Sequence, residues 1–540
     1  MGSHEIDADG SSTLGDFTTT PRVVPIAGLA VIIGIFAAYV AAALLKLIAF
    51  FTNLFFFQRL GSTAVTPAAH HLGPWVILVP VAGALIIGVM ARFGSDKIRG
   101  HGIPEAIEAI LMNGARVEPK VAILKPVSAA ISIGSGGPFG AEGPIIMTGG
   151  AFGSLIAQFF HLTSAERKTL LVAGAAAGMS ATFAAPVASV ILGVELLLFE
   201  WKPRSVIPVA LASVTAGALR RHILGVGPVF PVPVHATAIG AAGLAGCVVV
   251  GLLGGVLSAL LTEGVYASED AFGRLPVHWM WWPALGGLAI GIGGYIFPPA
   301  LGVGYDVIGE LLQGDTPMRI LLGVLLVKST IWAVSLGSGT SGGVLAPLLM
   351  VGGALGGLEA HFLPDAGPGF WALVSMGSVL GGTMRAPLTA VVFALELTHD
   401  ITVLLPLLLA VTVSYGFTVL LLRRSILTEK ISRRGYHLSC EYAVDPLEII
   451  FAKEVMQPVN GHAGAVNGVV AHPDEPLRVI VYRMAQTGRT ELPVVSDGHT
   501  VGWLTLNDLL AARTRILEAE QNRERVLGTG FLVSWGRRES

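Results

Sequence analysis

The most specific chemistry in the sequence lies in two glycine-rich stretches, GSGGPFGAEGPIIMTGG at 134–150 and GSGTSGGVLAPLLMVGG at 337–353. Glycine allows the backbone to turn with its N–H groups exposed. A helix that begins directly after such a turn directs the positive end of its dipole toward the turn. Converging N–H groups form a weak, uncharged anion site. Ion conduction needs weak binding, because a full Lys or Arg charge would retain the ion. We therefore predict an anion site here.

Two other interpretations of these glycines are weaker. GSGGPFG does not have the GxGxxG spacing, and no Gly-Lys-Ser/Thr follows it, so a nucleotide phosphate site is not indicated. The glycines could instead serve only the close packing of helices. That interpretation alone does not account for the spacing that the two stretches share.

The shared spacing indicates a duplication. In each stretch the GSG triplet begins ten residues before a proline, Pro144 or Pro347. Further along each copy, a glutamate follows a proline by nine residues, at Glu195 and at Glu396. The offset between the copies is about 200 residues. Membrane proteins with such internal repeats usually form the substrate site where the two copies meet.

Glu142 lies between two glycines in GAEGP, inside apolar sequence. A carboxylate in such surroundings is costly and is functional by default. At a convergent N-terminal site it could occupy the place of the anion, so that its protonation or displacement opens the path. The alternative role is that of a capping carboxylate for the helix that begins at Pro144.

Other ionisable residues in the apolar segments have less specific signals. Glu195 and Glu396 end apolar helices, and we expect helix-end carboxylates, with Arg385 and Lys328 as candidate partners, rather than a proton relay. His101 in RGHGIPE precedes a short helix. A hydrogen-bonded structural histidine and a residue of the ion path are equally compatible with its position.

The composition places most of the chain in a membrane. Of its 540 residues, 53% are hydrophobic and 13% charged, against about 25% charged in soluble domains, and its mean hydropathy is +0.71. The net charge of -2 implies no polyanionic partner. Two cysteines, Cys247 and Cys440, exclude a disulfide framework. No metal-ligand cluster, Ser–His–Asp set or suitably spaced carboxylate pair is evident, so we expect neither a metal site nor an enzyme.

The apolar segments predict an all-α, multi-pass membrane fold with broken helices. The segment 22–57 is long enough for a tilted span, and residues 1–20 form a polar, cytoplasmic leader. Several later segments are shorter than the roughly 20 residues of a full span or contain proline, which indicates half-helices that meet inside the membrane. These segments are 74–92, 121–134, 144–160, 168–200, 205–224, 236–265, 279–297, 318–336, 343–358, 370–397 and 401–422.

The composition changes after Arg424. A basic cluster follows the last apolar segment directly, so the positive-inside rule places this end in the cytoplasm. Within 453–513 we expect a helix at VIVYRMAQTG, strands at ELPVVSD and VGWLTL, and a helix from Asn507, which together form a small α/β domain. A charged tail covers 516–540.

At this point the sequence resembles the CLC family of chloride channels and proton-coupled chloride transporters. The motifs that carry the resemblance are GHGIPE (100–105), GSGGPFGAEGP (134–144), GSGTSGGVLAP (337–347) and MRAPLTAVVFALELT (384–398). The resemblance implies a membrane domain at 21–435 with two inverted repeats, roughly 21–225 and 236–435. It also implies chloride transport, a homodimer with one pore in each subunit, and cytoplasmic termini at the plasma (inner) membrane.

The resemblance also assigns site residues. The gating glutamate of the family falls on Glu142. The anion-binding positions fall on Gly100, His101, Gly102, Ile103, Glu142, Gly143, Val344, Leu345 and Leu427. Several positions depart from the family: Ala141 replaces an arginine, His101 a serine and Leu427 a tyrosine, and the third motif, 343–347, lacks its usual phenylalanine. The side-chain donors of the central anion site are therefore missing, and we expect its selectivity to differ.

The inner proton-transfer glutamate of the family falls on Leu196, one residue after Glu195. This favours a gated chloride channel over a proton/anion antiporter, although Glu195 or His101 could substitute in a proton path. The tail resembles a single CBS domain at 450–515, a module that senses adenosine nucleotides and works in pairs. We expect no cofactor other than an adenosine nucleotide at this domain, with pairing across the dimer as a hypothesis and Asp508 as a ribose-contact candidate by analogy. A purely structural cytoplasmic cap is the equally compatible alternative. A third alternative is a membrane-anchored nucleotide sensor without transport.

Overall fold

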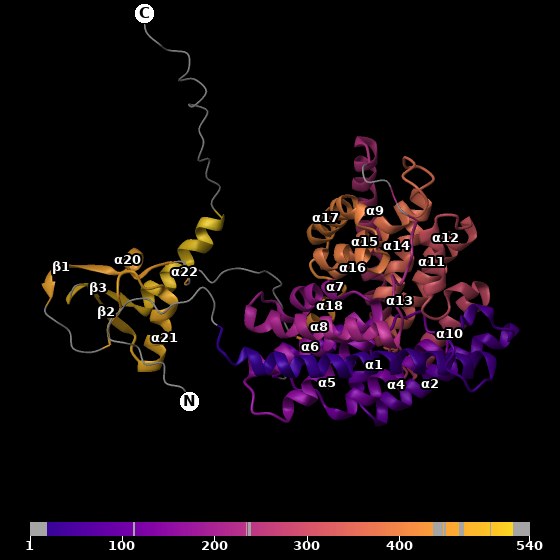
Figure 1. Ribbon diagram of the computed structural model, residues 1–540, viewed down its shortest axis with the longest axis horizontal. Coiled ribbons are helices and arrows are strands. Elements are labelled where there is room, and N and C mark those ends of the chain that lie inside the picture. The colour runs from indigo at the N-terminus through magenta and orange to yellow at the C-terminus, as the bar shows by residue number, and fades with distance from the viewer. Residues whose placement is uncertain are drawn as a thin grey trace, which may run out of the picture. The chain divides into compact units, whose positions relative to one another are not determined.

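The computed structural model describes residues 19–111, 114–233, 235, 239–435, 447, 450–463, 469–496 and 498–521. The chain divides into two compact units, Met1–Cys440 and Glu441–Ser540. The first unit is helical and the second combines helices with a small sheet (Figure 1). Of the two cysteines, Cys247 is buried and carries a free thiol, and Cys440 lies outside the described residues.

The described helices of the first unit follow the predicted apolar segments closely. They are α1 (Val23–Phe57), α2 (Leu78–Phe93), α3 (Ile103–Leu111), α4 (Pro119–Gly134), α5 (Glu142–Gln158), α6 (Ser164–Phe183), α7 (Pro186–Leu192), α8 (Pro203–Ile223), α9 (Ala241–Gly273), α10 (Trp282–Ile296), α11 (Tyr305–Gln313), α12 (Met318–Gly323), α13 (Ser329–Gly337), α14 (Leu345–Glu359), α15 (Phe370–Met384), α16 (Pro387–Thr398), α17 (Leu404–Leu421) and α18 (Ile426–Arg433). Figure 1 shows the indigo and magenta helices of the first half beside the salmon and orange helices of the second half.

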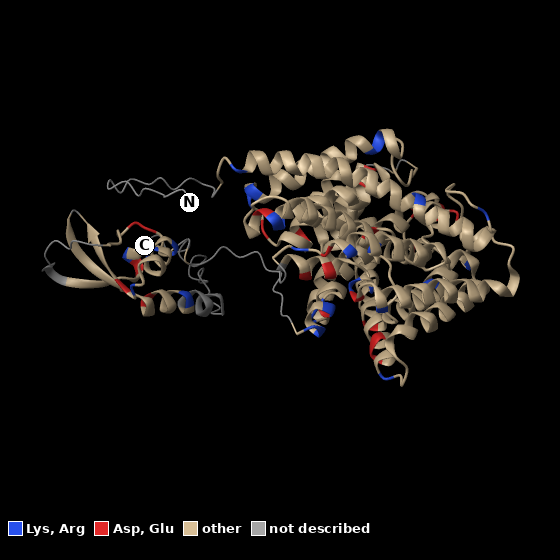
Figure 2. Ribbon diagram, turned by 90° about the horizontal axis from the view of Figure 1, so that it is seen from below, with Lys and Arg blue, Asp and Glu red and all other residues tan. Residues whose placement is uncertain are grey.

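The prediction of broken helices is confirmed. Five helices are long and apolar enough to cross a membrane, at 23–57, 73–93, 241–273, 318–337 and 401–433, and four shorter apolar helices lie among the described residues. In the membrane unit, long stretches of helix carry no charged residue (Figure 2). Such surfaces suit lipid, because charged side chains are costly in the hydrocarbon region.

The two halves break their helices at matching positions. Ala184 ends α6 and Arg385 ends α15, and both adopt a left-handed backbone with φ of 56°. Two residues later a proline, Pro186 or Pro387, occupies the first helical position of α7 or α16. Proline fits there because the first N–H groups of a helix have no partner within it. The structure therefore has the same helix break in both halves, and the sequence encodes it twice.

Some glycines serve close packing, as the weaker interpretation proposes. A Cβ atom on Gly149 of α5 would lie 2.3 Å from the carbonyl oxygen of Gly174 in α6. In the second half, a Cβ atom on Gly352 of α14 would lie 2.9 Å from the Cα of Met376 in α15. Small residues let helix backbones approach this closely in membranes. The glycine pairs that end the two stretches are thus packing residues.

One of the helices, α11, was not predicted from the sequence. The segment YDVIGELLQ forms α11, which begins after Gly304 in a left-handed conformation with φ of 82°. Its alternating polar and apolar residues do not stand out as an apolar segment. In the first half α3 is a helix of the same length, nine residues. The duplication therefore extends to these two short helices.

The second unit has the predicted α/β elements. Its described elements are α20 (Ala452–Val455), β1 (Gln457–Ala463), α21 (Leu477–Thr487), β2 (Glu491–Ser496), β3 (His499–Thr505) and α22 (Leu506–Gln521). The sheet has the order β1-β3-β2, and both pairs are antiparallel. A core that includes Ile480, Leu492 and Leu504 joins α21 to the sheet.

The carboxylate of Asp508 is engaged in the local structure of α22. It accepts hydrogen bonds from the backbone N–H and the hydroxyl of Thr505, at 2.8 and 2.6 Å, and from the side-chain amide of Gln457 at 3.0 Å. This is the geometry of a residue that stabilises a helix N-terminus. The ribose contact expected of Asp508 stays a prediction.

Candidate anion site

The glycine-rich stretches of the two halves meet inside the membrane unit. Gly140 and Gly343 exchange two backbone hydrogen bonds, of 3.2 and 3.0 Å, and form an antiparallel bridge. The loop before α3 joins them, because Gly100 forms a parallel bridge with Ser341. Three motifs that are far apart in the sequence thus share one point. The convergence on which the sequence prediction depends is present.

Glu142 lies at this point. It is the first residue of α5 and is fully buried. Its carboxylate faces the backbone N–H groups of Glu142 itself and of Ala346, in the first turn of α14. Its Oε2 atom has no hydrogen-bond partner among the described residues. The negative side chain therefore sits where the positive ends of two helices meet, one from each half.

The glycines around Glu142 leave room for its carboxylate. A Cβ atom on Gly140 would lie 1.6 Å from the Oε2 atom of Glu142, and one on Gly343 would lie 3.0 Å from it. A Cβ atom on Gly143 would lie 1.8 Å from the carbonyl oxygen of His101. Larger residues would push either the carboxylate or the loop before α3 out of place. Close approach, rather than unusual backbone angles, therefore requires Gly140 and Gly143.

A buried lysine fixes the loop before α3. Lys125 is fully buried, and its ammonium group donates to the carbonyl oxygens of Ile98 and Gly100, at 2.9 and 2.8 Å. Glu105 accepts a hydrogen bond of 2.9 Å from the N–H of Gly102. The N–H of Gly100 donates to the carbonyl oxygen of Thr340. The backbone N–H groups of two predicted anion-binding positions, Gly100 and Gly102, are therefore already hydrogen-bonded within the protein.

The residues that replace the two missing side-chain donors, His101 and Leu427, are both buried. His101 is 2% exposed, and its Nδ1 atom has no hydrogen-bond partner in the described parts of the chain. Leu427 is fully buried in the first turn of α18, which packs against α3. The structure therefore brings the inner predicted positions together beside α3. The remaining ones, Ile103, Val344 and Leu345, begin α3 and α14 or immediately precede α14, and all three are buried.

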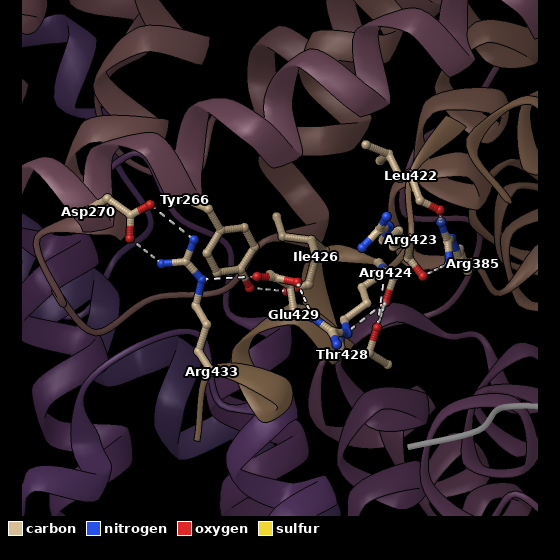
Figure 3. Close-up of polar contacts among 11 residues, drawn as sticks. Tyr266, Asp270, Arg385, Leu422, Arg423, Arg424, Ile426, Thr428, Glu429 and Arg433 are labelled. Carbon is tan, nitrogen blue, oxygen red and sulfur yellow. Dashed lines mark hydrogen bonds and ion pairs between the residues drawn. The ribbon is translucent and has the colours of Figure 1, made fainter. Parts of the chain in front are cut away.

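A network of ion pairs anchors α18 (Figure 3). Arg433 pairs with Asp270 at the end of α9 and with Glu429 in its own helix. The hydroxyl of Tyr266 donates a hydrogen bond of 2.5 Å to the carbonyl oxygen of Ile426, and the guanidinium of Arg433 lies 4.7 Å from the centre of the tyrosine ring. These contacts hold the turn that carries Leu427.

A cavity of about 410 Å³ lies beside this region. Charged residues of both signs line it: Arg99, Glu105, Glu108, Glu269, Lys430 and Arg434. It also reaches Gly339 in the second glycine-rich stretch. A polar, solvent-accessible space thus adjoins one side of the convergence point.

Glu195 of the first half caps a helix of the second half, and Glu396 of the second half caps a helix of the first. The carboxylate of Glu195 accepts hydrogen bonds from the N–H groups of Leu388 and Thr389, at 3.2 and 2.9 Å, in the first turn of α16. The carboxylate of Glu396 accepts from Val187 and Ala188, at 3.0 and 2.8 Å, in the first turn of α7. Both are helix-end carboxylates, as expected.

The expected cationic partners lie elsewhere. Arg385 donates to the carbonyl oxygens of Thr418 and Leu422, and Lys328 donates to that of Gly302. No hydrogen bond joins Glu195 to Glu142 within the described ranges. The neighbouring Leu196 is 6% exposed and offers no ionisable group.

Sequence reasoning missed Tyr305, the first residue of α11. Its hydroxyl lies 3.4 Å from the Oε1 atom of Glu142 and can donate to it. It also missed the paired roles of Lys125 and Lys328. Each lysine precedes the GSG triplet of its half by nine residues, so this signal was present in the sequence.

Comparisons with known proteins agree with this geometry. A family model described as "Voltage gated chloride channel" matches residues 82–419, and a CBS domain model matches 452–515. A ClcB-like chloride channel protein from Ralstonia nicotianae is 32% identical over 354 residues, which cover 63% of this chain and 82% of the relative. An H(+)/Cl(-) exchange transporter ClcA from Salmonella paratyphi A is 29% identical over 405 residues, which cover 71% and 82%.

Solved structures give the same result. The crystal structure of a slow cyanobacterial Cl-/H+ antiporter has a TM-score of 0.67 and 25% identity, and the match covers 77% of this chain and 99% of that one. A eukaryotic CLC transporter has a TM-score of 0.63 at 18% identity, with coverages of 90% and 98%, and supports the fold. The chain therefore belongs to the CLC family: it is a multi-pass membrane protein that transports chloride and carries a CBS domain in its C-terminal part.

Proposed function

We propose that Glu142 is the gate of this chloride transporter. The supporting observation is the position of its carboxylate, where the first turns of α5 and α14 meet. Chloride and a carboxylate are both stabilised by N–H groups at helix N-termini, so the two compete for one place. The path is closed while the ionised side chain occupies that place, and it opens when the side chain is protonated or displaced.

The transport mode proposed is passive, gated conduction. The residue at the inner proton-transfer position is the buried Leu196. The adjacent carboxylate, Glu195, already accepts hydrogen bonds from α16. No ionisable side chain at that position is therefore able to accept a proton from Glu142.

Proton-coupled exchange is the second candidate, because the relatives favour it. The matched Salmonella protein is named as an H(+)/Cl(-) exchange transporter, and the cyanobacterial structure is that of a Cl-/H+ antiporter. Reversal potentials of the full chain in lipid bilayers, across a chloride gradient, separate the two. Passive conduction predicts the chloride equilibrium potential, with or without a pH gradient. A shift of the reversal potential with the pH gradient would establish exchange instead.

The gate itself is tested by Glu142→Gln. The amide cannot carry the charge that competes with chloride, so we expect chloride efflux from proteoliposomes to lose its dependence on pH. Glu310→Gln is the matched control, because Glu310 is an exposed residue of α11. An unchanged pH profile in E142Q would show that Glu142 is not the gate in either transport mode.

We also propose the assembly and ligand that the family implies. The chain forms a homodimer with one pore in each subunit. It lies in the plasma membrane, and both termini are on the cytoplasmic side. The basic cluster after α17 supports this orientation. The CBS unit binds an adenosine nucleotide and pairs with that of the partner subunit. Size-exclusion chromatography with light scattering tests the dimer, and calorimetry with AMP and ATP tests the nucleotide site.

A further inference from the structure

Tyr305 is the aromatic residue that contacts the carboxylate of Glu142. Its hydroxyl lies 3.4 Å from Oε1, and the residue is partly buried. Two aromatic rings pack against it edge-on: Phe183 at 6.4 Å and Phe230 at 5.8 Å between ring centroids. Phe183 in turn packs against Phe393 at 5.4 Å. The phenol thus packs against two aromatic rings, and its hydroxyl donates to Glu142.

The backbone next to Tyr305 is fixed to the first glycine-rich stretch. The N–H of Gly302 donates a hydrogen bond of 3.0 Å to the carbonyl oxygen of Gly136. The ammonium group of Lys328, which is fully buried, donates to the carbonyl oxygen of Gly302 at 2.7 Å. Gly304 adopts φ of 82°, which favours glycine. The start of α11 therefore cannot shift easily relative to Glu142.

The first half has a matching buried lysine and short helix, but the first residue of that helix differs. Lys125 fixes the loop before α3 as Lys328 fixes the loop before α11. However, α3 begins with Ile103, whereas α11 begins with Tyr305. The duplicated scaffold accordingly presents an apolar side chain at one short helix and a hydroxyl donor at the other. The hydroxyl is on the copy that contacts Glu142.

We propose that Tyr305 is a positioning residue of the gate, which holds the ionised Glu142 in the blocking position. This inference rests on the gating role proposed for Glu142. A phenol donates a stronger hydrogen bond to a carboxylate than to a neutral carboxylic acid. Tyr305 therefore favours the charged, blocking form, and its hold weakens when Glu142 takes up a proton. The two packed rings add to this, because they hold the phenol in its orientation toward the carboxylate.

The test is Tyr305→Phe, which keeps the ring and removes the hydroxyl. Chloride efflux from proteoliposomes is measured between pH 4.5 and 8. A hydrogen bond to a charged group contributes about 1.5 kcal/mol at the weak end of its range, which corresponds to roughly a tenfold change. We expect the midpoint of activation to move up by about 0.5–1 pH unit and efflux at neutral pH to rise about three- to tenfold. Tyr295→Phe is the matched control, because Tyr295 is 51% exposed on α10.

Two further variants make the outcome decisive. In the Glu142→Gln background, Tyr305→Phe should change nothing, because the hydroxyl then has no charged group to hold. Replacing Tyr305 with 3,5-difluorotyrosine, a stronger donor, should move the midpoint to lower pH. The inference is overturned if Y305F leaves the midpoint unchanged, or if it alters efflux equally with and without E142Q. An E142Q variant that retains the normal pH profile would instead overturn the gate itself.

Discussion

Gly140→Ala should open the gate without any change to Glu142. The added Cβ atom would lie 1.6 Å from Oε2 and 2.4 Å from Cδ of Glu142, and the three nearest atoms all belong to this carboxylate. The N–H of Gly140, which donates to Gly343, is retained in alanine. The carboxylate must therefore leave its place. If it forfeits the hydrogen bond from the hydroxyl of Tyr305, of about 1.5 kcal/mol, the blocked state loses stability by roughly a factor of ten.

The assay is the ratio of chloride efflux at pH 4.5 to that at pH 7.5, in proteoliposomes with equal protein content. We expect this ratio to fall to about one in G140A, as in E142Q, because protonation no longer controls the gate. Gly28→Ala in α1 is the control, since a Cβ atom there meets nothing within 4 Å. A G140A protein that folds normally, stays closed at pH 7.5 and opens at pH 4.5 would show that the carboxylate does not lie beside Gly140.

Two further predictions concern stability. Lys328→Met removes the donor to the carbonyl oxygen of Gly302 and should lower the free energy of unfolding by about 2 kcal/mol. Thermal unfolding in detergent checks this against Lys97→Met, whose side chain is 41% exposed; equal effects would contradict it. In the CBS unit, burial would raise the pKa of Glu475, but hydrogen bonds from Arg483 and the N–H of His472 outweigh it and leave the pKa lowered. The stabilisation is therefore complete above about pH 4.3 and is lost as the pH falls through the lowered pKa. In thermal unfolding at a series of pH values, Glu475→Gln should destabilise the unit at pH 7 and progressively less as the pH falls. A loss that does not depend on pH would argue against the ion pair.

The arrangement of the helices and the convergence of the motifs were open to sequence reasoning. Apolar length predicts α1, and the spacing from GSG to proline exposes the duplication because both are local patterns. Glu142 stands out since an acid in apolar sequence is costly. These signals depend on a residue and its near neighbours along the chain.

The contacts that complete the site depend on residues from different segments. Tyr305 is 163 residues from Glu142 and begins an amphipathic helix that resembles a surface element. Glu195 and Glu396 were recognised as helix-end carboxylates, but the helices that they cap lie in the opposite half. Local periodicity does not encode such pairings. The repeated Lys-to-GSG spacing was the one available signal for the buried lysines.

The exchange of caps between α7 and α16 has a consequence for how the chain is made. The N–H groups in the first turn of α7 donate to Glu396, which is synthesised about 200 residues later. Until then the N–H groups of Val187 and Ala188 lack the carboxylate that they contact in the complete chain. Each half supplies the carboxylate that caps a helix of the other half. The reciprocal caps therefore make the complete folding of the first half depend on the synthesis of the second.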